Sequence, residues 1–137
     1  MKLHYDINGS DFSAAGEASS AVKKVLAQLS VNPSIIRRVA IAMYEAEINT
    51  VIHANGGVAD IEITPEKIVI VFTDNGPGIP NIELAMNEGY STASSQIREL
   101  GFGAGMGLPN MKKYADELII DSKVGVGTTV KMIVNIT

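Results

Sequence analysis

The chain has 137 residues, with 11 Lys and Arg against 15 Asp and Glu, a formal net charge of -4 and 46% hydrophobic residues. A chain of this length forms one globular domain and buries about two-thirds of its unfolded surface, so we expect a single domain over 1–137 that needs no disulfide or metal to fold. The absence of cysteine excludes disulfides, thiolate zinc sites and cysteine nucleophiles, and the acidic balance argues against nucleic acid as a partner.

The start of the chain predicts a short strand over residues 3–7. It lacks the apolar core of a signal peptide, and no later stretch approaches the ~20 apolar residues of a membrane span. We therefore expect a cytoplasmic protein with no membrane partner.

Two helices are predicted next. Asp11 or Ser13 begins the first, which runs to about Leu29. Its apolar stripe comprises Val22, Val25, Leu26 and Leu29. The second covers roughly 34–53 and is apolar around most of its girth, which is typical of a buried, central helix.

The rest of the chain predicts strands around a long loop. Residues 61–63 alternate in polarity and 68–72 are apolar, which indicates a hairpin. Residues 74–107 contain seven of the 13 glycines and one plausible short helix at about 81–87, and loops of that length are usually functional. A helix, a strand, a turn and a last strand follow, at 108–114, 118–120, 125–127 and 128–136. These elements predict an α+β two-layer sandwich.

The predicted central helix aligns Glu45, Asn49 and His53 down one side. An amide oxygen is a ligand for Mg²⁺, and a carboxylate one turn earlier is able to accept a proton from an attacking hydroxyl. The alternative is structural, with both polar groups bonding loop backbone. We expect His53 to be a packing or hydrogen-bonding residue and His4 to lie at the surface.

Two glycine-containing segments are candidate nucleotide contacts. In Asp74-Asn75-Gly76-Pro77-Gly78, a carboxylate at a strand end is placed to accept a hydrogen bond from an exocyclic amine such as that of adenine; the alternative is a plain turn. From Gly101 to Pro109, alternating glycines run into a helix, a junction that suits phosphates; the alternative is a glycine hinge. The chain has no mononucleotide P-loop, Rossmann or ordinary protein-kinase motif.

Together these motifs resemble those of a known superfamily. Glu45-x-x-x-Asn49, Asp74-x-Gly76-x-Gly78 and Gly103-x-Gly105-x-Gly107 resemble, in order and spacing, the N box and the two glycine boxes of the histidine-kinase-like ATPases. The closing Gly127-Thr128-Thr129-Val130 is similar to their final motif. Within the superfamily, the chain most resembles the stand-alone anti-sigma-factor serine/threonine kinases and related switch kinases.

The resemblance implies a Bergerat-type sandwich, a mixed sheet with helices on one face, with a lid at about 88–107. It implies that Glu45 is the general base, that Asn49 holds Mg²⁺ and that Asp74 binds the adenine amine, supported through water by Thr128. Gly76 and Gly78 would face the base. The phosphates would be bound by Gly103, Gly105, Met106, Gly107 and Leu108.

The implied function is Mg-ATP-dependent phosphorylation of Ser or Thr on an anti-sigma-antagonist partner, with a sigma factor as a further partner and a homodimer as a possible assembly. Two alternatives stay open: a binding module gated by nucleotide without phosphate transfer, and a detached catalytic domain serving a histidine on another chain. One position departs from the pattern. Some anti-sigma kinases carry a basic residue just ahead of the G-M-G stretch, where this chain has Gly103 and Ala104. The nearest basic residues are Arg98, Lys112 and Lys113.

Overall fold

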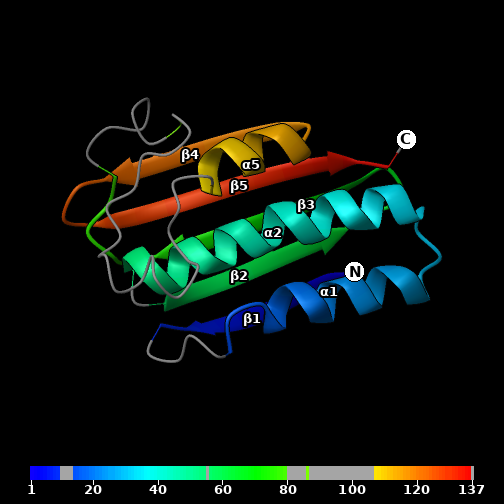
Figure 1. Ribbon diagram of the computed structural model, residues 1–137, viewed down its shortest axis with the longest axis horizontal. Coiled ribbons are helices and arrows are strands. Elements are labelled where there is room, and N and C mark those ends of the chain that lie inside the picture. Colours follow the sequence, from blue (N-terminus) through cyan, green and yellow to red (C-terminus); the bar gives the residue numbers. More distant parts are fainter. Residues whose placement is uncertain (10–13, 55, 80–85, 87–106, 137) are drawn as a thin grey trace.

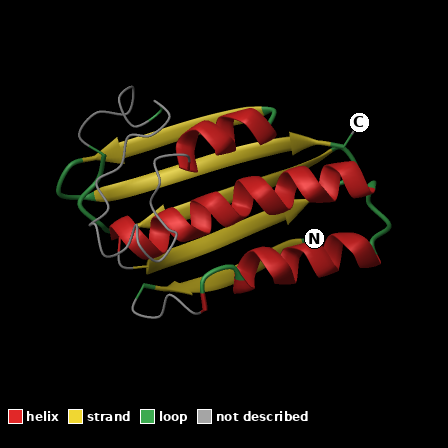
Figure 2. Cartoon of the chain, in the orientation of Figure 1, coloured by secondary structure: helices red, strands yellow, loops and turns green. Residues whose placement is uncertain are grey.

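The computed structural model describes residues 1–9, 14–54, 56–79, 86 and 107–136. A five-stranded sheet in the order β1-β2-β3-β5-β4 is covered on one face by helices (Figures 1 and 2). The elements are β1 (Lys2–Asn8), α1 (Glu17–Gln28), α2 (Pro33–Ala54), β2 (Gly56–Ile63), β3 (Lys67–Asp74), α5 (Gly107–Tyr114), β4 (Glu117–Lys123) and β5 (Gly127–Asn135). Among the described residues, no helix has both the length and the apolarity to cross a membrane.

The α+β two-layer sandwich is confirmed, but the expectation of a mixed sheet is wrong, because all four strand pairings are antiparallel. Two helices separate β1 from β2, so the chain crosses the sheet an even number of times and returns antiparallel to β1. β2 joins β3 as a hairpin, as predicted. β4 and β5 form a second hairpin, and β5 rather than β4 lies beside β3. A βαβ crossover between neighbouring strands, which would produce a parallel pair, is therefore avoided.

The core lies between the sheet and α2, which runs between α1 and α5 (Figure 1). Alternate residues of the central strands point toward the helices, so Ile61, Ile70 and Met132 are each at most 2% exposed. From α2, Val39, Met43 and Val51 pack against them. The prediction of a buried central helix is thus confirmed.

The first helix differs from its prediction at both ends. α1 begins at Glu17, and the expected caps Asp11 and Ser13 lie outside the described residues. Its N-cap is Gly16, which has φ 99° and no side chain to offer the first turn. Leu29, expected on the buried stripe, is 45% exposed because it follows the last helical residue. The predicted helix at 81–87 also lies outside the described residues, apart from Met86.

A carboxylate from α2 caps α1 in place of a local side chain. Glu47 is only 2% exposed. Its Oε2 accepts from the backbone N–H groups of Gly16 at 2.8 Å and Ala18 at 3.3 Å. Its Oε1 accepts from the N–H of Ser19 at 3.0 Å and from the Ser19 hydroxyl at 2.7 Å. Glu47 therefore satisfies N–H groups that a helix leaves without partners at its N-terminus, and it fastens α1 to α2.

Replacing Glu47 with Gln should lower the free energy of unfolding by about 2 kcal/mol, because an amide nitrogen would replace one acceptor oxygen among four donors. The control is Glu45→Gln, two residues along the same helix and partly exposed, which should change stability by less than about 0.5 kcal/mol. Urea denaturation followed by circular dichroism measures both. Equal stabilities for the two variants would contradict the capping role.

Candidate functional site

One end of the molecule gathers the predicted site residues. β3 and β4 end there, β5 and α5 begin there, and the C-terminal half of α2 lies across it (Figure 1). The register places Asp74 on β3 directly opposite Thr128 on β5. The strand order therefore joins two motifs that lie far apart in the sequence.

Asp74 is held by backbone donors on one carboxylate oxygen. Its Oδ1 accepts from the N–H groups of Gly76 at 2.9 Å and Thr128 at 3.2 Å. Among the described residues, none donates a hydrogen bond to Oδ2. The carboxylate is half-buried, so it is oriented by the protein and still has an oxygen available to a ligand donor.

Ser122 and Thr128 form a hydroxyl pair beside Asp74. Their oxygens lie 2.7 Å apart, and the Ser122 hydroxyl oxygen also accepts from the Ile79 N–H at 2.7 Å. Thr128 is buried, at 8% exposed. Sequence reasoning identified Thr128 and missed Ser122, whose role depends on the β4–β5 pairing. The pair connects the Asp74 loop to the β4–β5 hairpin.

The structure gives these glycines a role in close packing. A Cβ on Gly76 would lie 2.8 Å from the Ala54 Cα, and a Cβ on Gly127 would lie 2.1 Å from the Asp74 carbonyl oxygen. Gly78 has φ 80°, a left-handed conformation that favours glycine. The loop after β3 thus approaches the end of α2 and the start of β5 more closely than any side chain would permit.

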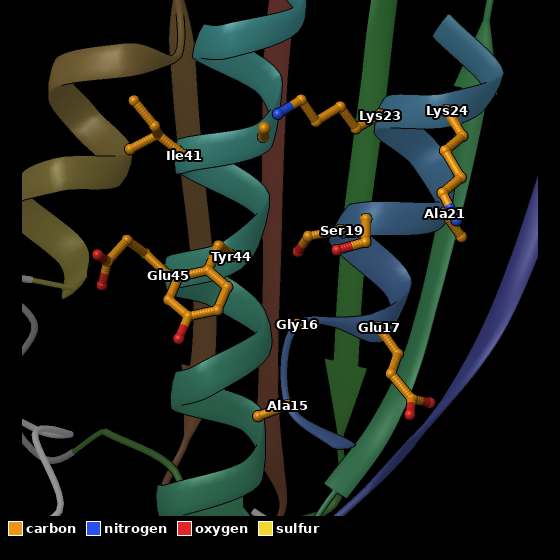
Figure 3. A pocket seen from close by; sticks show the side chains of 12 residues that line it. Ala15, Gly16, Glu17, Ser19, Ala21, Lys23, Lys24, Ile41, Tyr44 and Glu45 are labelled. Carbon is orange, nitrogen blue, oxygen red and sulfur yellow. The ribbon is translucent and has the colours of Figure 1, made fainter. Parts of the chain in front are cut away.

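Glu45 and Asn49 lie on α2, both partly exposed, as their spacing predicts. Asn110, in the first turn of α5, donates from Nδ2 to Glu45 Oε1 at 3.3 Å. Glu45 also lines a groove of about 810 Å³ between α1 and α2. Figure 3 shows Tyr44 beside Glu45 on α2 and the Lys23 side chain extending from α1 toward α2. Glu45 therefore lies between α5 on one side and an open groove on the other.

The other end of α5 is fixed to α2 by an ion pair. Arg38 donates from Nε to the Tyr114 carbonyl at 3.0 Å and from Nη2 to Asp116 Oδ1 at 3.0 Å. The N–H of Asn135, which donates to the other oxygen, is the main cause that lowers the pKa of the Asp116 carboxyl, and Arg38 adds to it. Sequence reasoning did not single out this pair, because its two sides are 78 residues apart.

Several predicted residues lie outside the described part of the chain: Arg98, Gly103, Ala104, Gly105 and Met106. Gly107 begins α5. Leu108 packs into the core at 7% exposed, so its backbone alone remains for a phosphate. Lys112 and Lys113 are exposed.

The two histidines remain outside the site as far as it is described. His4 is exposed, as predicted, and the Asp60 carboxylate 2.6 Å from its Nδ1 raises the pKa of the imidazole. Nothing in the described residues places the His53 side chain.

The donor set suits a weakly held Mg²⁺. Among the described residues, no group of three or more His, Asp or Glu side chains could hold a metal ion. Asn49 offers one amide oxygen, and Mg²⁺ commonly takes one or two protein ligands together with substrate phosphates and waters. The residues present therefore fit a cation that arrives with a nucleotide.

Comparison with known proteins gives one family and two named relatives. The family model described as "Histidine kinase-like ATPase domain" matches residues 10–134. The chain is 33% identical over 100 residues to the "Serine/threonine-protein kinase RsbT" of Bacillus subtilis, covering 70% of this chain and 69% of that protein. It is 35% identical over 120 residues to the "Anti-sigma F factor" of Caldanaerobacter subterraneus subsp. tengcongensis, covering 84% of this chain and 80% of that protein.

Solved structures share the fold at low sequence identity. The RsbU and RsbW domains of a Mycobacterium tuberculosis protein match 98% of this chain with a TM-score of 0.67 and 17% identity, and the match spans 32% of that solved chain. The SiaB-SiaC complex from Pseudomonas aeruginosa matches 96% of this chain and 88% of that chain, with a TM-score of 0.63 and 15% identity.

Proposed function

Because this chain belongs to the histidine kinase-like ATPase domain family, we propose that it is a Mg-ATP-dependent protein kinase that phosphorylates Ser or Thr on a partner protein. The observation that carries the proposal is the Asp74 carboxylate, oriented through Oδ1 at the same end of the fold as Glu45 and Asn49. The names of the two relatives, a serine/threonine-protein kinase and an anti-sigma factor, support the choice of reaction.

In this proposal the adenine amine donates to Asp74 Oδ2, and Thr128 supports that contact through water. Gly76 and Gly78 lie against the base, and Asn49 binds Mg²⁺. The phosphates are bound by the backbone of Gly103, Gly105, Met106, Gly107 and Leu108. The start of α5 contributes because the first N–H groups of a helix attract anions.

The reaction is a phosphoryl transfer. The acceptor hydroxyl oxygen forms a bond to the γ-phosphorus as the bond from that phosphorus to the bridging oxygen breaks, and ADP leaves. Glu45 accepts the hydroxyl proton through its carboxylate. Mg²⁺, when bound, neutralises phosphate charge. The protein's contribution is to position these groups, and no residue of it becomes covalently modified.

The acceptor is proposed to be a protein of anti-sigma-antagonist type that reaches Glu45 over the groove between α1 and α2. Glu45 lines this groove, and its partial exposure leaves it accessible to a hydroxyl carried by another protein. The whole chain, 1–137, acts as one cytoplasmic domain in this proposal. Binding to a sigma factor and pairing with a second copy are compatible with it.

A second candidate is a regulator that binds its partner without transferring phosphate. The observation in its favour is that Gly103 and Ala104 occupy positions where some related kinases have a basic residue. Among the described residues near the start of α5, the basic ones are Lys112 and Lys113, both exposed.

Calorimetric titration with Mg-ATP, followed by incubation with labelled ATP and a purified anti-sigma-antagonist protein, separates these functions. The kinase proposal expects saturable binding and an acid-stable phosphate on the partner. Binding without transfer would favour the regulator, and an acid-labile product would indicate a histidine acceptor. A folded protein that binds no nucleotide would sink the proposal.

A further inference from the structure

We propose that Asn110 is a positioning residue for Glu45, and that it makes the orientation of this base depend on the first turn of α5. The inference rests on the proposed function, since it assigns Glu45 the role of base. It adds a residue that none of the three sequence motifs contains as a functional position.

The contact has one reasonable chemical assignment. An ionised carboxylate only accepts hydrogen bonds, so the Asn110 amide must turn its nitrogen toward Glu45. Nδ2 and Oε1 lie 3.3 Å apart, and both side chains are partly buried. Among the described residues, Asn110 alone hydrogen-bonds to Glu45, and Oε2 receives no hydrogen bond from them.

The contact fixes a side chain that is otherwise free to rotate. Glu45 projects from the outward side of α2 beside Tyr44 (Figure 3), and a partly exposed Glu with no partner samples several rotamers. A donor on Oε1 selects among these rotamers and leaves Oε2 to accept the proton of the acceptor hydroxyl. A base held in one orientation reaches the reactive geometry more often.

The place of Asn110 in the fold connects this base to the nucleotide. Asn110 lies three residues after Gly107, the first residue of α5 and the last glycine of the predicted phosphate motif. The far end of α5 is tied to α2 through Arg38, which bonds the Tyr114 carbonyl and Asp116. A phosphate that orders the start of α5 would therefore also set the position of the donor to Glu45.

A double-mutant cycle tests the coupling. Asn110→Leu removes the donor and nearly keeps the volume, and it should lower kcat about tenfold with the KM for ATP within about twofold. In a Glu45→Gln background the same change should have no further effect on the residual rate, because the base it positions is gone. Arg38→Met is the matched control: it loosens the other end of α5, and its effect should be the same in both backgrounds. Equal effects of Asn110→Leu in both backgrounds would overturn the inference.

A measurement that needs no activity separates this inference from the proposed function. The side-chain amide signals of Asn110, assigned by their loss in Asn110→Leu, should shift in Glu45→Gln, while those of Asn32 at the other end of α2 should not. Unshifted Asn110 signals in a protein that transfers phosphate would overturn the positioning role and leave the kinase standing. A wild type that transfers no phosphate would overturn the kinase, and the positioning role with it.

Discussion

Replacing Glu45 with Gln is expected to lower the rate of phosphate transfer to the partner by about a thousandfold, within the range that general bases contribute. The amide keeps the size of the side chain and an oxygen that still accepts from Asn110. It has no site for the hydroxyl proton at neutral pH. The affinity for Mg-ATP should stay within about twofold, because the nucleotide contacts are assigned to Asp74, Asn49 and the glycines. Rapid-quench kinetics under single-turnover conditions measure the rate, and calorimetry measures the affinity.

Glu47→Gln is the control, since it makes the same chemical change two residues away on the same helix. Its carboxylate is committed to the first turn of α1, so below its unfolding transition this variant should transfer phosphate at close to the wild-type rate. If Glu45→Gln kept its rate within about fivefold, Glu45 would not be the base, and a partner residue or water would have to take the proton.

Asp74→Asn should weaken ATP binding by about a hundredfold, because a site built to accept from an amine would instead present a donor to it. The fold should tolerate the change. The amide oxygen is able to replace Oδ1 as acceptor for the Gly76 and Thr128 N–H groups, which leaves Nδ2 at the position facing the base. Stability should therefore change much less than affinity. Asp121→Asn, the same change on an exposed carboxylate of β4, should leave affinity unaltered.

The replacement also predicts a change of specificity. Inosine triphosphate carries a carbonyl oxygen where ATP carries the exocyclic amine, so it should bind weakly to the wild type and more tightly to Asp74→Asn. Calorimetric titration of both proteins with both nucleotides tests this. Equal weakening for the two nucleotides would show that Asp74 supports the structure of the site and does not read the amine.

Local patterns predicted most of the fold. The girdle of apolar residues identified α2, the alternation before Thr64 identified the β2–β3 hairpin, and the spacing of Glu45 and Asn49 placed them on one side of a helix. These features depend on residues a few positions apart, where the periods of helices and strands are read directly. The family resemblance supplied the remaining expectation, a sandwich with its helices on one face.

Features that depend on distant partners were not predicted. Nothing near Glu47 in the sequence shows that it caps a helix that begins 30 residues earlier. The pairing of Asp74 with Thr128 entered only through the resemblance, because no local pattern shows that β5 lies beside β3. The same gap explains the wrong expectation of a mixed sheet. Ser122 and Asn110 were missed because hydroxyl and amide side chains acquire a role only once their neighbours are known.

The place of β5 between β3 and β4 bears on how the protein is made. Synthesis proceeds from the N-terminus, so β5 is the last described strand to leave the ribosome, although it lies inside the sheet. Until it emerges, β3 exposes an unpaired edge of apolar residues to other nascent chains. Asp74 likewise lacks its Thr128 partner until then. A ribosome stalled before Gly127 should hold a chain that is easily digested by protease, and that ATP does not protect.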